Sequence, residues 1–152
     1  ALVAGLDGKL VRMRGSLIYL DAATMIYVAV DSIAPVGDDE AGPAPATEEL
    51  GEQVLQGEIV DSKCHLGLMD PSTGKVHRGC AARCISGGIP PMLHVEDASG
   101  KVANLLLVGS DGRALNKDVL PLVGEPVRVR GRAVRFENLL VLYAEPEAIE
   151  RL

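Results

Sequence analysis

The chain has no tryptophan, one phenylalanine and three tyrosines among its 152 residues. Proteins that bind single-stranded nucleic acid stack bases on aromatic side chains, and this chain offers little material for such a platform. It is also poor in positive charge, because 15 basic residues stand against 21 acidic ones and the net charge is −6. Affinity for nucleic acid comes largely from cationic contacts to phosphate, so we expect no nucleic-acid partner.

Long apolar runs are also missing. No stretch approaches the roughly 18 consecutive apolar residues of a membrane-spanning helix, so we expect no membrane span within this chain. The first residues show neither the basic nor the apolar region of a secretion signal. Since the sequence begins at Ala1 rather than at a methionine, we allow for a leader or a membrane anchor upstream.

Signatures of the common enzyme classes are absent too. The sequence contains no P-loop, no G-x-G-x-x-G and no G-x-S-x-G motif. Its apolar share of 47% and charged share of 24% are those of a folded globular chain of one domain or two small ones. We therefore lean toward a protein that is not an enzyme.

Cysteine and histidine are scarce, and they are concentrated in one place. All three cysteines and two of the three histidines fall within 21 positions, from Cys64 to Cys84, and His94 follows ten residues later. Thiolate and imidazole are good ligands for soft and borderline metal ions. The sequence therefore places any chemical site in this segment.

Residues 62–91 are rich in glycine and proline and interrupt a pattern of strands. Within them, residues 75–86 have the length of a short helix, and two glycines and a proline follow it. At about 100° per residue, His77, Cys80 and Cys84 share a stripe roughly 60° wide on that helix. We expect these three side chains to point the same way.

Cys64 ends the preceding strand and can approach the same stripe. The sequence therefore predicts a tetrahedral metal site with four ligands: Cys64, His77, Cys80 and Cys84. His65, and after it His94 and Asp61, are reserve ligands. Zinc suits this set best, and an iron–sulfur cluster or copper(I) are alternatives.

Two other uses of the same cysteines stay open. A disulfide from Cys64 to Cys80 or Cys84 would close a loop of about 15 residues and stabilise the fold by roughly 3 kcal/mol. The chain would then be a stapled interaction module without metal, and the third cysteine a small buried side chain. Alternatively, the three thiols serve a thiol redox or electron-transfer protein.

The chain also contains an internal repeat. Residues 1–33 align without gaps on residues 117–149, and nine of the 33 pairs are identical. Each copy alternates apolar and polar residues as a β-hairpin does. Gly15 and Gly131 interrupt the first strand of each copy, which is typical of bent strands in small closed barrels. We interpret the repeat as one hairpin unit used twice.

The remaining patterns complete a mainly β fold. Strands are predicted at 54–61, 92–96 and 102–108, and a short helix or turn at 116–123, before the second hairpin. Five strands of this kind predict an OB-like antiparallel barrel over residues 52–152, with the helical Cys/His insertion at 62–91. Residues 1–35 are a partial second copy of the unit.

The two copies are separated by an acidic linker rich in proline and alanine at 36–51, which we expect to be exposed and mobile. The front half of the first copy either lies upstream of Ala1, or its hairpin packs on the second barrel.

The insertion resembles a loop found in other proteins. The string Asp61-Ser62-Lys63-Cys64, then His77-x2-Cys80-Ala81-x2-Cys84, then Gly88-Ile89-Pro90 is similar to the loop D-x2-C…H-x2-C-A-x2-C…G-x-P of uncharacterised bacterial exported proteins with an OB-fold-like domain. The resemblance covers roughly residues 54–145. It implies a periplasmic or other extracytoplasmic location and no particular reaction.

Taken together, these features predict a non-enzymatic metal-binding β-domain. We expect it to be an accessory or structural subunit of a membrane-associated bacterial envelope complex, with protein partners.

Overall fold

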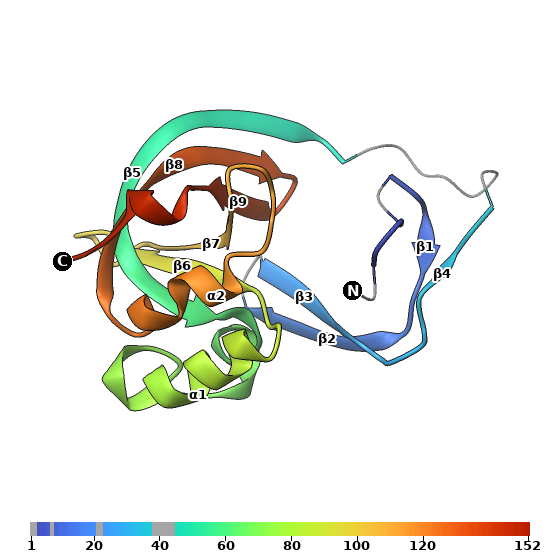
Figure 1. Cartoon of the computed structure of the whole chain (residues 1–152), viewed down its shortest axis with the longest axis horizontal. Helices are drawn as coiled ribbons and strands as arrows, with labels where there is room; N and C mark the ends of the chain where they lie inside the picture. The colour runs from blue at the N-terminus through green and yellow to red at the C-terminus, as the bar shows by residue number, and fades with distance from the viewer. Residues whose placement is uncertain (1–2, 7, 21–22, 38–44) are drawn as a thin grey trace.

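The structure is a computed structural model that describes the whole chain except residues 1–2, 7, 21–22 and 38–44 and the side chain of Leu68. Its main body is a closed barrel of five strands (Figure 1). In chain order these are β5 (Thr47–Asp61), β6 (Pro91–Glu96), β7 (Val102–Val108), β8 (Pro126–Phe136) and β9 (Leu139–Tyr143).

The ring of strands runs β5–β6–β7–β9–β8 and returns to β5. This order, with a helical segment between the third and fourth strands, confirms the OB-like barrel. One ladder differs from the antiparallel prediction, because β7 and β9 are parallel, with Leu105 opposite Leu140. The reason is geometric: strand direction cannot alternate all the way around a ring with an odd number of strands.

Strand β5 begins seven residues before its predicted start, at Thr47 instead of residue 54. Its first half pairs with β8 from Thr47 opposite Phe136 onward, with a bulge between Glu49 and Gly51. These residues are mostly exposed and show no apolar alternation, so the sequence pattern did not reveal them. Residues 47–51 of the predicted linker are therefore strand, and residues 38–44 lie outside the described part of the chain.

Two helices close one end of the barrel (Figure 1). Helix α1 (Gly74–Ser86) confirms the helix predicted at 75–86, and α2 (Asn116–Val119) is followed by the 3-10 helix η3 (Leu120–Leu122). Ala81 and Ile85 of α1 are buried in the barrel core. The Asn116 side-chain amide donates hydrogen bonds to the carbonyl oxygens of Ile85 and Ile89, at 2.7 and 2.8 Å.

The N-terminal part of the chain forms two small ladders beside the barrel. Strand β1 (Val11–Arg12) pairs with β4 (Ala34–Pro35), and β2 (Gly15–Leu20) pairs with β3 (Ala23–Val28). One face of the β2–β3 hairpin packs on the barrel side, where Ile18 lies in a cluster with Leu66 and Met92. The hairpin of the first copy is thus packed on the second barrel.

The two copies pair their strands in the same register. Leu17 pairs with Ile26 in the first hairpin, as Ala133 pairs with Leu142 in the second, at the constant offset of 116. The β1–β4 ladder matches, at the same offset, the ladder between β8 and β10 (Ile149–Arg151), which follows the 3-10 helix η4 (Pro146–Ala148). The aligned segments therefore have equivalent strand pairing.

Candidate metal centre

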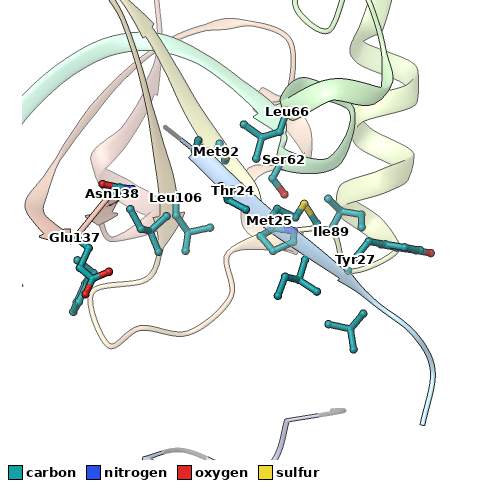
Figure 2. A pocket seen from close by; sticks show the side chains of 17 residues that line it. Thr24, Met25, Tyr27, Ser62, Leu66, Ile89, Met92, Leu106, Glu137 and Asn138 are labelled. Atoms are coloured by element: carbon teal, nitrogen blue, oxygen red, sulfur yellow. The ribbon is translucent and has the colours of Figure 1, made fainter. Parts of the chain in front are cut away.

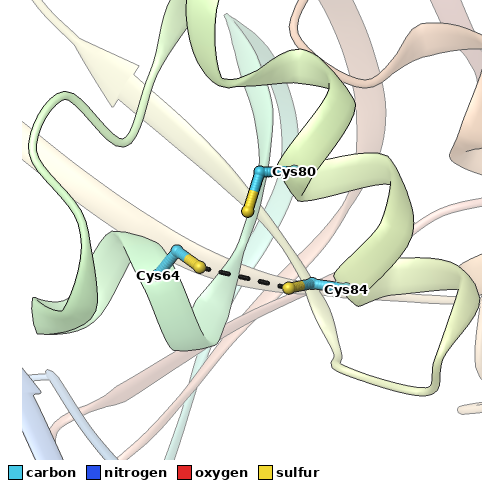
Figure 3. Close-up of side chains that lie close together, drawn as sticks. All are labelled: Cys64, Cys80 and Cys84. Carbon is cyan, nitrogen blue, oxygen red and sulfur yellow. Dashed lines mark hydrogen bonds between the residues drawn. The ribbon is translucent and has the colours of Figure 1, made fainter.

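The site lies between the end of β5 and helix α1, in the segment that follows the barrel wall. Strand β5 ends at Asp61, and a short helical segment, η2 (Cys64–Leu68), follows almost at once. Cys64 comes from η2, whereas Cys80 and Cys84 lie four residues apart and therefore on one side of α1. Figure 3 shows the three side chains directed toward one another from these two elements.

The distances between the thiols match those around a single ion. The Sγ atoms of Cys64 and Cys84 are 4.0 Å apart, and all three sulfurs lie within 4.8 Å of one another. A tetrahedral zinc ion with Zn–S bonds of about 2.3 Å holds its sulfurs about 3.8 Å apart. A disulfide bond is only about 2.05 Å long. The cluster can therefore hold a metal ion with little movement.

His77, the fourth predicted ligand, is in contact with a buried carboxylate. Its Nε2 atom lies 3.0 Å from Oδ2 of Asp61, and both side chains are buried. Asp61, Cys64 and His77 form a second group whose potential ligand atoms lie within 4.8 Å of one another. The structure thus brings the three predicted thiols together and places His77 beside them, on the buried carboxylate of Asp61.

Asp61 links the two groups. Its Oδ1 atom accepts a hydrogen bond of 2.8 Å from the main-chain N–H of Cys64, while Oδ2 contacts His77. From the sequence, Asp61 was predicted only as a reserve ligand. Its position at the end of a buried strand, three residues before a cysteine, was the one available signal of this role.

The electrostatics of the cluster favour a bound cation. Burial raises the pKa of the Cys64 thiol strongly, and the nearby Asp61 carboxylate raises it further. Burial and then Asp61 also raise the pKa of Cys84. Without a cation these thiols are protonated at neutral pH. A divalent ion would stabilise their thiolates and would also lie beside the buried carboxylate.

His65 lies outside both groups of potential ligands. Its Nε2 atom is 2.9 Å from Oδ1 of Asn104, and its Nδ1 atom is 3.0 Å from Oγ of Ser72. An amide oxygen only accepts, so Nε2 carries the proton and Nδ1 accepts from the serine hydroxyl. Burial lowers the pKa of His65, which keeps the ring neutral. The reserve ligand His65 therefore ties η2 to β7.

His94 shares the same acceptor. Its Nδ1 atom lies 2.9 Å from Oδ1 of Asn104, and its ring packs edge to face on that of His65, with the centroids 4.7 Å apart. Neither Asn104 nor Ser72 was singled out in the sequence. Asparagine and serine are common surface residues, and nothing in their spacing signals this contact.

All three cysteines are free in this structure, so the disulfide alternative is not realised in it. Cys64 is buried, Cys84 is half-buried and Cys80 is exposed. A reactive thiol needs a lowered pKa, whereas the pKa values of Cys64 and Cys84 are raised. Cys64 and Cys84 therefore lack the lowered pKa of an activated thiol.

Comparison of the chain with protein-family models, curated proteins and solved structures finds no match. Among the described residues, no helix combines the length and the apolarity needed to cross a bilayer.

Proposed function

We propose that this chain is a metal-binding OB-like β-domain that holds one thiophilic ion, zinc in the first place, on Cys64, Cys80 and Cys84. The observation that carries the proposal is the convergence of the three sulfurs within 4.8 Å, at the spacing of a mononuclear tetrahedral site. Iron–sulfur clusters usually take four cysteines, and the chain has three, so a single zinc or copper(I) ion fits better.

His77 is the nearest candidate for the fourth ligand. A histidine that binds a metal commonly donates the proton of its other ring nitrogen to a carboxylate, which orients the ring. Asp61 is in hydrogen-bond contact with His77 and would serve as that carboxylate. The predicted Cys3His set then acquires Asp61 as the residue that positions His77.

The role of the ion would be structural. The segment between β5 and β6 buries Leu66, Ala81 and Ile85, and an ion would add a direct link between η2 and α1. A structural zinc ion supplies on the order of 10 kcal/mol of apparent binding free energy. That is ample to order this segment, which in turn supports both the end of the barrel and the N-terminal hairpin.

We also propose that the domain is a non-enzymatic accessory subunit of a bacterial envelope complex in the periplasm. The exposed apolar side chains of the N-terminal unit, Leu17, Tyr19 and Ile26 among them, support a protein partner. The extracytoplasmic location rests on the resemblance of the cysteine loop to that of exported proteins. Co-purification of the tagged chain with a defined membrane complex from the native cell tests this part.

Elemental analysis of the purified chain, together with mass mapping under non-reducing conditions, tests the metal site. We expect close to one zinc ion per chain and three unbridged cysteines. Replacing zinc with Co²⁺ should give intense thiolate-to-metal absorption. Cys64→Ser and Cys84→Ser should weaken binding most, and His77→Gln less. His94→Gln is the matched control, because His94 lies outside both ligand groups, and it should bind normally.

A chain without metal and with a mapped Cys64–Cys84 disulfide would reject the metal site. It would favour the stapled interaction module instead. The thiol redox alternative draws support from the exposure of Cys80 and from the 4.0 Å separation of the other two sulfurs. It predicts reversible disulfide formation with a measurable redox midpoint in a chain that holds no zinc on these cysteines.

A further inference from the structure

A half-open cleft with a volume of about 600 Å³ lies between strand β3 and the wall of the barrel (Figure 2). Met25 and Tyr27 line it from the hairpin, and Leu66, Met92 and Leu106 line it from η2 and the barrel. None of the three cysteines takes part in its lining. The volume lies within the range of small-molecule binding sites.

One polar group in the wall of this cleft has no partner. The Ser62 side chain is only 5% exposed, and its hydroxyl forms no hydrogen bond with any described residue. Its main chain is held in place, because the Ser62 N–H donates a 3.1 Å hydrogen bond to the carbonyl oxygen of Pro90. Figure 2 shows the hydroxyl directed toward Met25, another residue of the cleft wall.

An unpaired buried hydroxyl is unfavourable, because it has lost its water and gained nothing in return. Most buried polar groups in folded proteins have a hydrogen-bond partner. The unpaired Ser62 hydroxyl therefore indicates a partner from outside the chain. An oxygen atom of a molecule bound in the cleft would supply the missing hydrogen bond.

The rest of the wall limits what that molecule can be. Of the described residues that line the cleft, only Glu137 in the β8–β9 turn carries a charge, and no lysine or arginine is among them. Lys63 lies over the ring of Tyr27 and does not line the cleft, so an anionic headgroup would lose its water there without a cation in the wall to pair with. The wall is otherwise largely aliphatic, with two methionines that adapt to ligands of varied shape.

We propose that this cleft binds an uncharged, largely apolar molecule with a single hydrogen-bonding oxygen, of the class of long-chain alcohols and acyl esters, and that this oxygen pairs with the Ser62 hydroxyl. The apolar tail lies between β3 and the barrel and adds to the contacts that hold the N-terminal hairpin. The site goes beyond the metal centre, since none of the three cysteines lines it.

Displacement of a neutral fluorescent probe, N-phenyl-1-naphthylamine, from the full chain tests the site. We expect saturable binding of one probe molecule, displaced well by decan-1-ol and more weakly by decane and by decanoate. Ser62→Ala should weaken decan-1-ol about 2- to 10-fold, the worth of one neutral hydrogen bond, and leave decane unchanged. Equal displacement by decan-1-ol and decane in the natural chain would overturn the role of Ser62.

The position of the site is tested by filling the cleft. Thr24, an exposed residue of β3 that lines the cleft, is changed to Trp, and Val54, an exposed residue of β5 outside it, is changed to Trp as the matched control. Thr24→Trp should abolish probe binding at unchanged circular dichroism, and Val54→Trp should not. Probe binding that is unsaturable, or equal in the two variants, would reject the cleft as a ligand site.

Discussion

The hairpins β2–β3 and β8–β9 have the same strand register but differ in the burial of one face. Leu142 in the second hairpin is 0% exposed, whereas its counterpart Ile26 in the first is 44% exposed. Ala133 and Leu17, which pair with them, are 2% and 63% exposed. The face that fills the barrel interior in one copy is therefore open in the other.

The glycines of the two hairpins show what the copies share. A Cβ atom added to Gly131 would overlap the carbonyl oxygen of Tyr143, and one added to Gly15 would overlap that of Tyr27. Each glycine thus permits the same close approach of the two strands. The bend and the register belong to the hairpin itself, while burial depends on the strands that surround it.

Removal of the metal should produce the largest difference between the copies. The first hairpin rests on Leu66 of η2, next to the thiol cluster, whereas the second is built into the barrel. We expect chelation of zinc to lower the free energy of unfolding by up to the order of 10 kcal/mol. Amides of β2–β3 should lose protection from hydrogen exchange before those of β8–β9. Equal loss in both hairpins would contradict the structural role of the ion for the first one.

Truncation of equivalent side chains should give the second-largest difference in stability between the two hairpins. Leu142→Ala removes a core side chain and should cost about 2–5 kcal/mol in the free energy of unfolding. Ile26→Ala removes a half-exposed one and should cost less than about 1 kcal/mol. Urea unfolding of both variants at equal zinc content measures the difference. Similar costs would mean that another surface covers Ile26 in solution.

Substitution of the two glycines, Gly131 and Gly15, should give the third-largest difference between the hairpins. Gly131→Ala forces β8 away from the Tyr143 carbonyl inside a closed barrel, and we expect a loss of about 1–3 kcal/mol in global stability. Gly15→Ala meets a similar clash but should open only the β2–β3 hairpin. Hydrogen exchange would then show faster β2–β3 amides with an unchanged unfolding midpoint. A lower midpoint for Gly15→Ala would show that the first hairpin is part of the cooperative core.

The smallest effect concerns a cation that lies over the equivalent tyrosine in each copy. Lys63 Nζ lies 3.8 Å from the ring centroid of Tyr27, and the Arg132 guanidinium carbon lies 4.4 Å from that of Tyr143. Lys63→Gln and Arg132→Gln should each cost about 0.5–1 kcal/mol. In Lys63→Gln the loss should appear as looser β2–β3 packing, since Lys63 joins that hairpin to η2. If the β2–β3 amides keep the same protection in Lys63→Gln, the contact between Lys63 and Tyr27 does not stabilise the packing of this hairpin.

Much of the fold could be predicted from the sequence. The helix expected at 75–86 is found at Gly74–Ser86, and the strand expected at 102–108 has the same bounds. Both have strong local signals, a glycine-terminated helical stripe in one case and an apolar run between turns in the other. The first half of β5 could not be predicted, because its exposed residues are held by pairing with β8 and not by burial.

The candidate site was predictable in part. Clustering of rare side chains along the chain and one helical stripe were enough to bring Cys80 and Cys84 together with Cys64. The same stripe predicted His77 among the thiols, and in the structure His77 lies in a group with Cys64 and Asp61. The unpaired hydroxyl of Ser62 could not be predicted from the sequence, because it depends on the absence of a hydrogen-bond partner among residues that surround it in space.

By itself the sequence determined the alternation and the equivalence of both hairpins, the position of α1 and the gathering of the thiols, because these follow from alternation and spacing between residues near one another in the chain. Only the tertiary structure decided which hairpin face is buried, that His77 lies on Asp61, and that a cleft opens beside Ser62. Those outcomes depend on contacts between segments far apart in the chain, which decide which side chains are buried and which hydrogen-bond partners they have.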